Sequence, residues 1–396
     1  MNGLLHGIRI LAISQFGAGP FGSLHLADLG AEVIKIENPK TGGDVARFVP
    51  PHTCPGDSLY FQSFNRNKKS ITLDLKHPDG QNVFQDLVRR SDAVFSNLRG
   101  DLPEALGLTY GHLEPINPRI VCCSLSGYGM TGPRRSEPAY DYLIQGLAGW
   151  MSLTGDPGTL PAKSGLSIVD YSAGAVAMVG LLAGLLDAQR TGHGCDVDVS
   201  LLDTAISMLN YVAIWTLNRG YHPERLEASA HPTLVPAQVF CTKDRYLLVL
   251  CFKEKFWQAL TELLDAPELG SDPRYASFAG RYEHRDALIA DLRERFLKRK
   301  TDEWLELFTG RVPCAPVNSV EEALQEEQVL ARDMLVEVEH PPFGTLKEVN
   351  TAVKVEGMDT CAEPAPALGA DTTQILKSVL DYGPEEISRL EQVGAI

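Results

Sequence analysis

The sequence is short of positive charge and of clustered cysteines. Lysine and arginine number 36 against 51 aspartates and glutamates, which gives a formal net charge of −15 over 396 residues. No basic stripe offsets this balance, so it argues against a nucleic-acid-binding protein. Anionic small ligands stay possible, because a local pocket can be positive on an acidic protein. The eight cysteines include no C-x-x-C pair, which disfavours a structural zinc site and predicts a reduced protein.

The sequence also lacks a signal-peptide pattern, a long transmembrane run, repeats and low-complexity segments. Its first ten residues have neither a charged start nor a long apolar core. Hydrophobic content of 44% and charged content of 22% are ordinary for a globular protein, and the length allows two domains. We therefore expect a soluble, cytoplasmic enzyme.

The first forty residues predict a β–α–β unit. Residues 7–14 form an apolar strand pattern, residues 15–22 a glycine-rich turn, and a helix follows as far as Leu29. Residues 31–37 alternate as a second strand. Such a unit implies a parallel sheet with a right-handed crossover.

The glycine-rich turn matches a dinucleotide-binding fingerprint in form. It contains G-x-G-x-x-G from Gly17 to Gly22, and Glu37 lies 20 residues after Gly17, where a ribose-binding acid is expected. Against this reading, three residues (14–16) separate the strand from the first glycine. Binding of NAD, binding of another phosphate-bearing nucleotide, and a turn that binds nothing all remain open at this point.

Two later strands would deliver polar residues to the same edge of the sheet. A strand over 70–75 precedes Lys76, and a strand over 92–96 precedes Asn97, Leu98 and Arg99. Ligands of open α/β sheets bind at the carboxyl ends of the strands. Lys76 and Arg99 would suit a phosphate-rich ligand, although lone basic residues are most often solvated.

The stretch from Ser164 to Leu186 contains the strongest candidate for a catalytic residue. A short, apolar, strand-like run over 166–169 leads to Asp170, and about four helical turns of Ala, Gly, Val, Leu and Met follow, too short to span a bilayer. A helix that is apolar all round is a buried one. Asp170 is then either a helix cap, as Ser172 could also be, or an ionised nucleophile at the positive end of the helix.

The order of elements predicts two domains. Strands and helices alternate up to residue 215, which is typical of a doubly wound α/β domain. Residues 216–235 are irregular and form the expected linker. A smaller α+β domain is expected over 236–318, and residues 319–396 return to the large domain.

As a set, the motifs resemble the family III CoA-transferases, which include formyl-CoA:oxalate and carnitine CoA-transferases. The resemblance extends from G-I-R-I-L to the closing G-A-I and rests on the order of many segments. They are A-E-V-I-K-I-E-N-P, N-R-N-K-K-S-I-T-L-D-L, S-L-S-G-Y-G-M-T-G-P, P-A-Y-D-Y-L-I-Q-G-L-A-G-W-M, the Asp170 stretch, T-G-H-G-C-D-V-D-V-S-L-L-D, A-H-P-T-L-V-P-A-Q and V-P-C-A-P-V.

The resemblance implies an α/β fold with a Rossmann-like large domain and a smaller α+β domain. It also implies a homodimer of two ring-like chains that interlock. Asp170 would be the nucleophile that carries an aspartyl-CoA thioester between donor and acceptor. The CoA thioester would be a substrate, with no permanently bound cofactor, no metal, and no nucleic acid or membrane as partner.

The resemblance also assigns binding residues. Gly17 and Ala18 would touch the pantetheine, the backbone near Leu73 the adenine, and Lys76 and Arg99 the phosphates. Asn97 would support the loop, and Leu98 is a further residue of the CoA-binding set. Gln15 and Tyr140 would lie near the thioester and the acceptor. The chain departs from the family at Asn38, where Arg is common and Lys40 would have to substitute, and at Ala105, where a basic residue is common.

The substrates are only partly indicated. No glycine cluster lies between His231 and Gln258, which argues against oxalate and leaves succinyl-CoA or another dicarboxyl-CoA as the expected donor. His231 itself is expected to be structural. The alternative function is an α-methylacyl-CoA racemase of the same superfamily, in which a His occupies the position of Tyr140; a phenol is a poor base near neutral pH. An acyl-CoA hydrolase and a binding module without chemistry are further alternatives.

Overall fold

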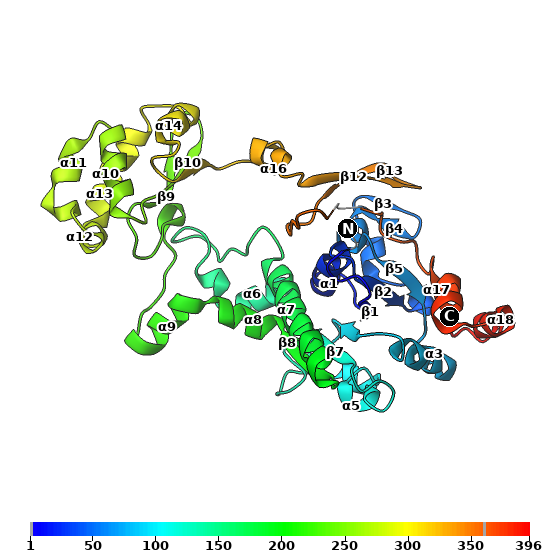
Figure 1. Cartoon of the computed structure of the whole chain (residues 1–396). Coiled ribbons are helices and arrows are strands. Elements are labelled where there is room, and N and C mark those ends of the chain that lie inside the picture. The colour runs from blue at the N-terminus through cyan, green and yellow to red at the C-terminus, as the bar shows by residue number, and fades with distance from the viewer. Residues whose placement is uncertain (1–2, 359–361) are drawn as a thin grey trace. The chain divides into compact units, whose positions relative to one another are not determined.

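The computed structural model describes residues 3–358 and 362–396 and divides into two compact units (Figure 1). The larger unit holds Met1–Ala148, Gly165–Asn210 and Gln328–Ile396, and the smaller unit holds Gly149–Ser164 and Tyr211–Glu327. Segment 149–164 therefore belongs to the smaller unit, whereas the sequence pattern assigned it to the large domain.

A parallel six-stranded sheet forms the centre of the larger unit. Its strands are β1 (Arg9–Ile13), β2 (Glu32–Glu37), β5 (Lys69–Thr72), β6 (Ala93–Ser96), β7 (Val121–Ser126) and β8 (Cys195–Ser200). Their order is β5-β2-β1-β6-β7-β8, and all five pairings are parallel. The prediction of an α/β unit with a parallel sheet is confirmed. The order reverses between β1 and β6, where open α/β sheets form their ligand crevice.

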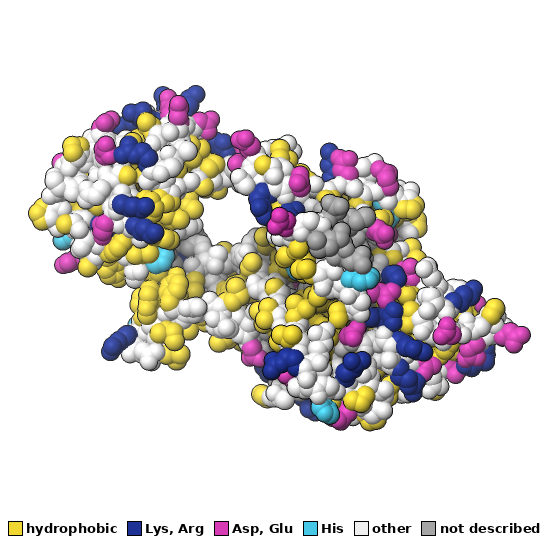
Figure 2. Space-filling view, viewed as in Figure 1, with side chains coloured by type: hydrophobic (Ala, Val, Ile, Leu, Met, Phe, Trp, Pro, Cys, Tyr) yellow, Lys and Arg dark blue, Asp and Glu magenta, His cyan; other side chains and the backbone are white. Residues whose placement is uncertain are grey.

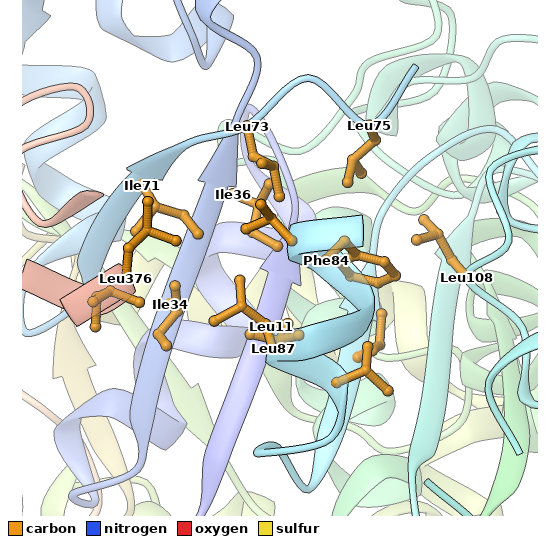
Figure 3. Packing of buried hydrophobic residues seen from close by; sticks show 14 of the residues in the cluster. Leu11, Ile34, Ile36, Ile71, Leu73, Leu75, Phe84, Leu87, Leu108 and Leu376 are labelled. Atoms are coloured by element: carbon orange, nitrogen blue, oxygen red, sulfur yellow. The ribbon is translucent and has the colours of Figure 1, made fainter. Parts of the chain in front are cut away.

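Helices cover both faces of this sheet. One face carries α1 (Ala18–Asp28) and α7 (Ile168–Thr191), and the other carries α3 (Pro78–Val88), α5 (Tyr110–Leu113), α17 (Thr372–Leu380) and α18 (Pro384–Gln392). Strand alternation explains the division: Val121 and Cys123 contact α7, whereas Cys122 points into the opposite core. Figure 3 shows that core, in which Leu11 and Ile36 lie near Phe84 and Leu87 of α3.

The remaining elements of the larger unit are short. They are β3 (Thr53–Cys54), β4 (Asp57–Ser58), α2 (Leu59–Asn65), α4 (Leu102–Ala105), α6 (Asp141–Leu147), α8 (Leu201–Met208), and the hairpin β12 (Leu335–His340) with β13 (Gly344–Val349).

The smaller unit has its own core. An antiparallel sheet of β11 (Cys314–Pro316), β10 (Tyr246–Leu250) and β9 (Ala237–Cys241) packs with helices around Phe240, Trp257, Phe296 and Trp304. The helices of this part are α10 (Glu254–Leu263), α11 (Pro267–Ser271), α12 (Phe278–Glu283), α13 (Arg285–Phe296), α14 (Thr301–Phe308) and α15 (Val320–Leu324). Two further helices, α9 (Asn210–Arg219) and α16 (Glu327–Ala331), lie at the boundaries between the units.

Helix α7 corrects two predictions. No strand forms over 166–169; the helix begins at Ile168, so Asp170 lies in its first turn. The helix is also not buried all round, because Val179 is 69% exposed and Leu186 59%. It has 24 residues and is longer than expected. By length and composition alone it could cross a membrane, but half of its most apolar stretch is buried, and the core helices of soluble proteins can be equally long and apolar.

Two glycines allow α1 and α7 to touch backbone to backbone. A Cβ added to Gly174 would lie 2.5 Å from the carbonyl oxygen of Ala18, and one added to Gly22 would lie 2.7 Å from the carbonyl oxygen of Gly174. Neither glycine has a positive φ, so the requirement is space and not backbone conformation. This contact sets the distance between the first turns of the two helices.

We predict that Gly174→Ala lowers the free energy of unfolding by about 1–3 kcal/mol, because the added methyl group must push two backbones apart. Chemical denaturation measures the change. Gly111→Ala is the matched control: Gly111 is also helical, and nothing lies within 4 Å of its missing Cβ. Equal stability of the two variants would contradict the proposed close contact.

Candidate active site

The candidate site is a pocket at the carboxyl ends of β1 and β6. It encloses about 230 Å³ and lies at the point where the strand order reverses. Its lining comes from the loop after β1, the loop after β6, the end of β7 and the first turn of α7. The lining residues used below are Gln15, Phe16, Gly17, Ala18, Asn97, Leu98, Arg99, Tyr140 and Asp170.

Asp170 is the buried carboxylate of this pocket. It is 9% exposed, and its side chain accepts no hydrogen bond from the described residues. Gly17 faces it: a Cβ on Gly17 would lie 3.0 Å from Oδ2 of Asp170. The space in front of the carboxylate therefore exists because residue 17 has no side chain.

A second buried carboxylate, Asp141, caps the helix that carries Asp170. Its Oδ2 accepts the backbone N–H groups of Val169 (2.7 Å) and Asp170 (3.0 Å), and its Oδ1 accepts the Gln145 side-chain amide (2.5 Å). Asp141 is 3% exposed. Asp141 is therefore the side chain that caps the start of this helix. The Asp170 side chain does not cap it and stays available for chemistry.

The pKa of Asp170 is raised to about 7. Burial is the larger cause, because a low-dielectric surrounding disfavours the charged form, and the negative charge of Asp141 adds to it. A group with this pKa is partly protonated near neutral pH and becomes a nucleophile as it ionises.

The loop that carries Gly17 is strained and firmly held. Phe16 has a φ of 65°, which is costly for an aromatic residue. Its N–H donates to Asp44 (3.0 Å), whose other oxygen accepts the buried Lys35 ammonium (2.7 Å). The backbone of Gln15 exchanges two 2.8 Å hydrogen bonds with the Asn97 side chain. These contacts impose a conformation that the loop would not adopt alone.

The first turn of α1 supplies free donors to the same pocket. The N–H groups of Gly17 and Ala18 donate no hydrogen bond to a described residue. By contrast, two N–H groups at the start of α7 are taken by Asp141. The N–H groups of α1 are thus available to a ligand in this pocket, whereas those of Val169 and Asp170 are not.

Most of the predicted site residues line this one pocket, and two do not. Leu73 has its side chain in the core, with its N–H donating to the Glu37 carbonyl oxygen. Lys76 is exposed and makes no ion pair with a described residue. Arg99 lines the pocket but is engaged by Asp101 through two hydrogen bonds of 2.6 and 2.8 Å.

Lys40, the suggested substitute for the missing Arg, pairs with Asp74 at 2.7 Å while its side chain is 61% exposed. No group of three or more possible metal ligands occurs among residues 3–358 and 362–396.

Asp141 and Asp44 were not among the residues predicted from the sequence. Asp141 directly follows Tyr140, so the A-Y-D-Y motif contained it, but only the fold brings it under the first turn of α7. Asp44 lies in a segment without a motif of its own, and no local signal could have found it.

The buried Asp170 should make stability depend on pH. Because its folded pKa is raised above 3.8, the favourable protonated state is fully present below about pH 4 and is lost as pH rises through 7. Asp170→Asn mimics the protonated form. We expect the variant to be more stable than the parent at pH 8, by on the order of 3 kcal/mol, with a smaller gain at pH 5. Thermal or urea unfolding at both pH values measures this. A gain independent of pH would show that Asp170 keeps an ordinary pKa.

Comparison with known proteins identifies the family of the chain. The sequence model of CoA-transferase family III matches residues 5–372. Human succinyl-CoA:glutarate CoA-transferase is 36% identical over 394 residues, covering 99% of this chain and 90% of that protein. Acetyl-CoA:oxalate CoA-transferase of Acetobacter aceti is 34% identical over 361 residues, covering 90% of each chain.

Among solved structures, a CAIB/BAIF family protein from Brucella suis superimposes with a TM-score of 0.81 at 32% identity, covering 96% of this chain and all of that one. With a family match over this span, and relatives that share more than a third of their residues, the chain belongs to CoA-transferase family III and is a CoA-transferase.

Proposed function

We propose that this protein moves CoA from succinyl-CoA, or another dicarboxyl-CoA, to a carboxylic acid acceptor through an aspartyl-CoA thioester on Asp170. The observation that carries the proposal is the pairing of a buried, unbonded carboxylate with free backbone N–H groups across one pocket. Nucleophilic acyl transfer needs these two parts: a nucleophile, and preorganised donors for the oxyanion.

The transfer proceeds by exchange at the Asp170 carboxylate. An oxygen of Asp170 attacks the thioester carbonyl carbon, the C–S bond breaks, and CoA leaves as a thiolate while a mixed anhydride remains. The thiolate then attacks the Asp170 carbonyl carbon and releases the donor acid, which leaves an aspartyl-CoA thioester. The acceptor carboxylate repeats the two steps in reverse and takes CoA away, so that Asp170 is restored.

Two features of the chain favour this reaction. The N–H groups of Gly17 and Ala18 can donate to the oxyanion in each step, where one such donor is worth about 10²–10³ in rate. The pKa of Asp170 near 7 keeps part of the carboxyl ionised at neutral pH while burial leaves it poorly solvated.

CoA would lie along the carboxyl ends of the strands of the large sheet. We assign the pantetheine to Gly17 and Ala18, the adenine to the backbone near Leu73, and the phosphates to Lys76 and Arg99. Arg99 would have to exchange its Asp101 partner for phosphate, because a guanidinium binds either anion through the same two-pronged contact. Gln15 and Tyr140 remain the proposed contacts of the thioester and the acceptor.

We further propose a cytoplasmic homodimer of interlocked chains. Support comes from apolar side chains that this chain alone leaves exposed, including Val176 and Val179 of α7 and Ile214 and Leu217 of α9. Figure 2 shows such side chains gathered over α9. Exposed patches of this kind mark interaction surfaces. The seven described cysteines are free, which suits a reducing compartment.

The choice of donor rests on the relatives and on chemistry. The human relative is named for succinyl-CoA and glutarate, whereas the Acetobacter relative is named for acetyl-CoA and oxalate, so the names alone do not decide between acids. The racemase alternative would need a base such as histidine, and none of the described residues that line the pocket is a histidine.

We predict that incubation with succinyl-CoA adds the mass of CoA to the protein, less one water, and that hydroxylamine removes the adduct. Asp170→Ala should form no adduct, because the nucleophilic oxygen is gone. Intact-protein mass spectrometry measures both. The matched control is Asp187→Asn, an exposed aspartate on the same helix, which should react like the parent.

Acetyl-CoA run in parallel tests the choice of donor, with slower adduct formation expected than with succinyl-CoA. Failure of the parent protein to react with any thioester would contradict the proposed mechanism. Proton exchange at the α-carbon of a branched acyl-CoA would then favour the racemase.

A further inference from the structure

The segment 14–16 is the part of the glycine-rich turn that departs from the dinucleotide fingerprint. There the first glycine follows the strand directly, whereas here three residues separate the end of β1 from Gly17. The last of them, Phe16, has a φ of 65°. A left-handed backbone is costly for an aromatic residue and persists only where the surrounding structure imposes it. The conformation of this segment is therefore maintained by contacts from outside it.

Asp44 and Lys35 supply contacts at both ends of the segment. Oδ1 of Asp44 accepts the N–H of Phe16 (3.0 Å). The Lys35 ammonium donates to the other carboxylate oxygen of Asp44 (2.7 Å) and to the carbonyl oxygen of Ser14 (2.5 Å). One ion pair thus holds the backbone before and after the middle residue of the segment.

This ion pair is completely buried, and it does not reach the pocket. The Lys35 and Asp44 side chains are 0% and 1% exposed. Neither is among the described residues that line the pocket of Asp170. Burying two charges is costly, and apolar residues of similar volume often give equal or greater stability. Stability alone therefore does not explain why a carboxylate and an ammonium occupy these positions.

The acceptor oxygen of Asp44 is itself fixed in place. It also accepts the N–H of Ala46 (2.9 Å), and the N–H of Asp44 donates to Glu37 (2.9 Å). Glu37 is paired with the buried Arg47 through hydrogen bonds of 2.9 and 2.7 Å. The oxygen that holds Phe16 cannot move without breaking several buried hydrogen bonds.

We propose that Asp44 and Lys35 are positioning residues of the reaction, which hold Phe16 in its left-handed conformation and so set the direction of the unpaired N–H groups of Gly17 and Ala18. The inference rests on the proposed function, because those N–H groups serve as oxyanion donors only in that reaction. Neither residue touches the substrate.

Peptide planarity transmits the effect of the ion pair to the donors. The N–H of Gly17 lies in the peptide plane that joins it to Phe16, so the dihedral angles of Phe16 set its direction once the preceding plane is fixed by Asp44. Donors stabilise an oxyanion best when they point at its position before the reaction begins. A relaxed Phe16 would turn this N–H away from the pocket.

The test compares two double variants of the full-length protein that differ in one hydrogen-bond acceptor. Lys35→Met with Asp44→Asn removes both charges but keeps an oxygen that can accept the Phe16 N–H. Lys35→Met with Asp44→Leu removes that oxygen as well. We measure single-turnover adduct formation with succinyl-CoA and with acetyl-CoA. The asparagine variant should react at nearly the parent rate, and the leucine variant about 10²-fold more slowly, as for the loss of one oxyanion donor.

CoA affinity separates positioning from binding. Calorimetry with free CoA should give dissociation constants for the two variants within about threefold of each other, because the affected interaction forms in the transition state. Asp44→Glu is the further variant should the leucine form not fold. It keeps a charge for Lys35 but shifts the acceptor oxygen by one CH₂ group, so we expect a rate at least about tenfold below the parent.

Arg66→Met with Asp28→Asn is the matched control. It removes another buried ion pair of the larger unit, whose side chains are 4% and 3% exposed and do not line the pocket. This variant should react like the parent. An equally slow control would overturn the inference, because damage to the fold would then explain the loss.

Two other results would also overturn the inference and leave the proposed function standing. One is equal rates for the asparagine and leucine variants, or a parent-like rate for Asp44→Glu. The other is a rate loss matched by an equal loss of CoA affinity, because the ion pair would then only support binding. If the parent protein forms no adduct, the proposed function itself fails.

Discussion

The site depends on the close contact between α1 and α7. Because Gly22 and Gly174 have no side chains, the two helices meet backbone to backbone, and their first turns lie next to each other. One turn carries the carboxylate of Asp170 and the other carries Gly17 and Ala18 with unpaired N–H groups. A larger residue at the contact would push the Asp170 carboxylate away from these N–H groups. The contact between Gly22 and Gly174 therefore affects both the stability of the fold and the geometry of the site.

Buried charged residues hold the first turn of α7 and the loop before α1 in place. Asp141 accepts the N–H groups that begin α7 and so fixes the backbone of Asp170, while its negative charge raises the pKa of that residue. Asp44, neutralised by the buried Lys35, holds the strained Phe16. Such groups are costly to bury, and each is compensated by several hydrogen bonds. The hydrogen bonds of this network also hold the loop in a backbone conformation that is strained at Phe16.

The backbone N–H groups around the Asp170 carboxylate differ in whether they are bonded. Asp141 accepts those of Val169 and Asp170 at the start of α7. The N–H groups of Gly17 and Ala18 at the start of α1 donate to no described residue, and both residues line the pocket of Asp170. Residues far apart in the chain thus surround one buried carboxylate.

The sequence by itself determined the class of fold and the family of the chain, and it singled out Asp170 as the candidate nucleophile. Apolar strands alternating with helices dictate a parallel sheet, and the ordered motifs around Asp170 mark the family. Local patterns could not determine where α7 begins, since residues 166–169 are as apolar as a strand and the cap, Asp141, is 29 positions from Asp170. The tertiary structure alone decided which donors face the carboxylate, because those contacts join residues that the chain brings together only on folding.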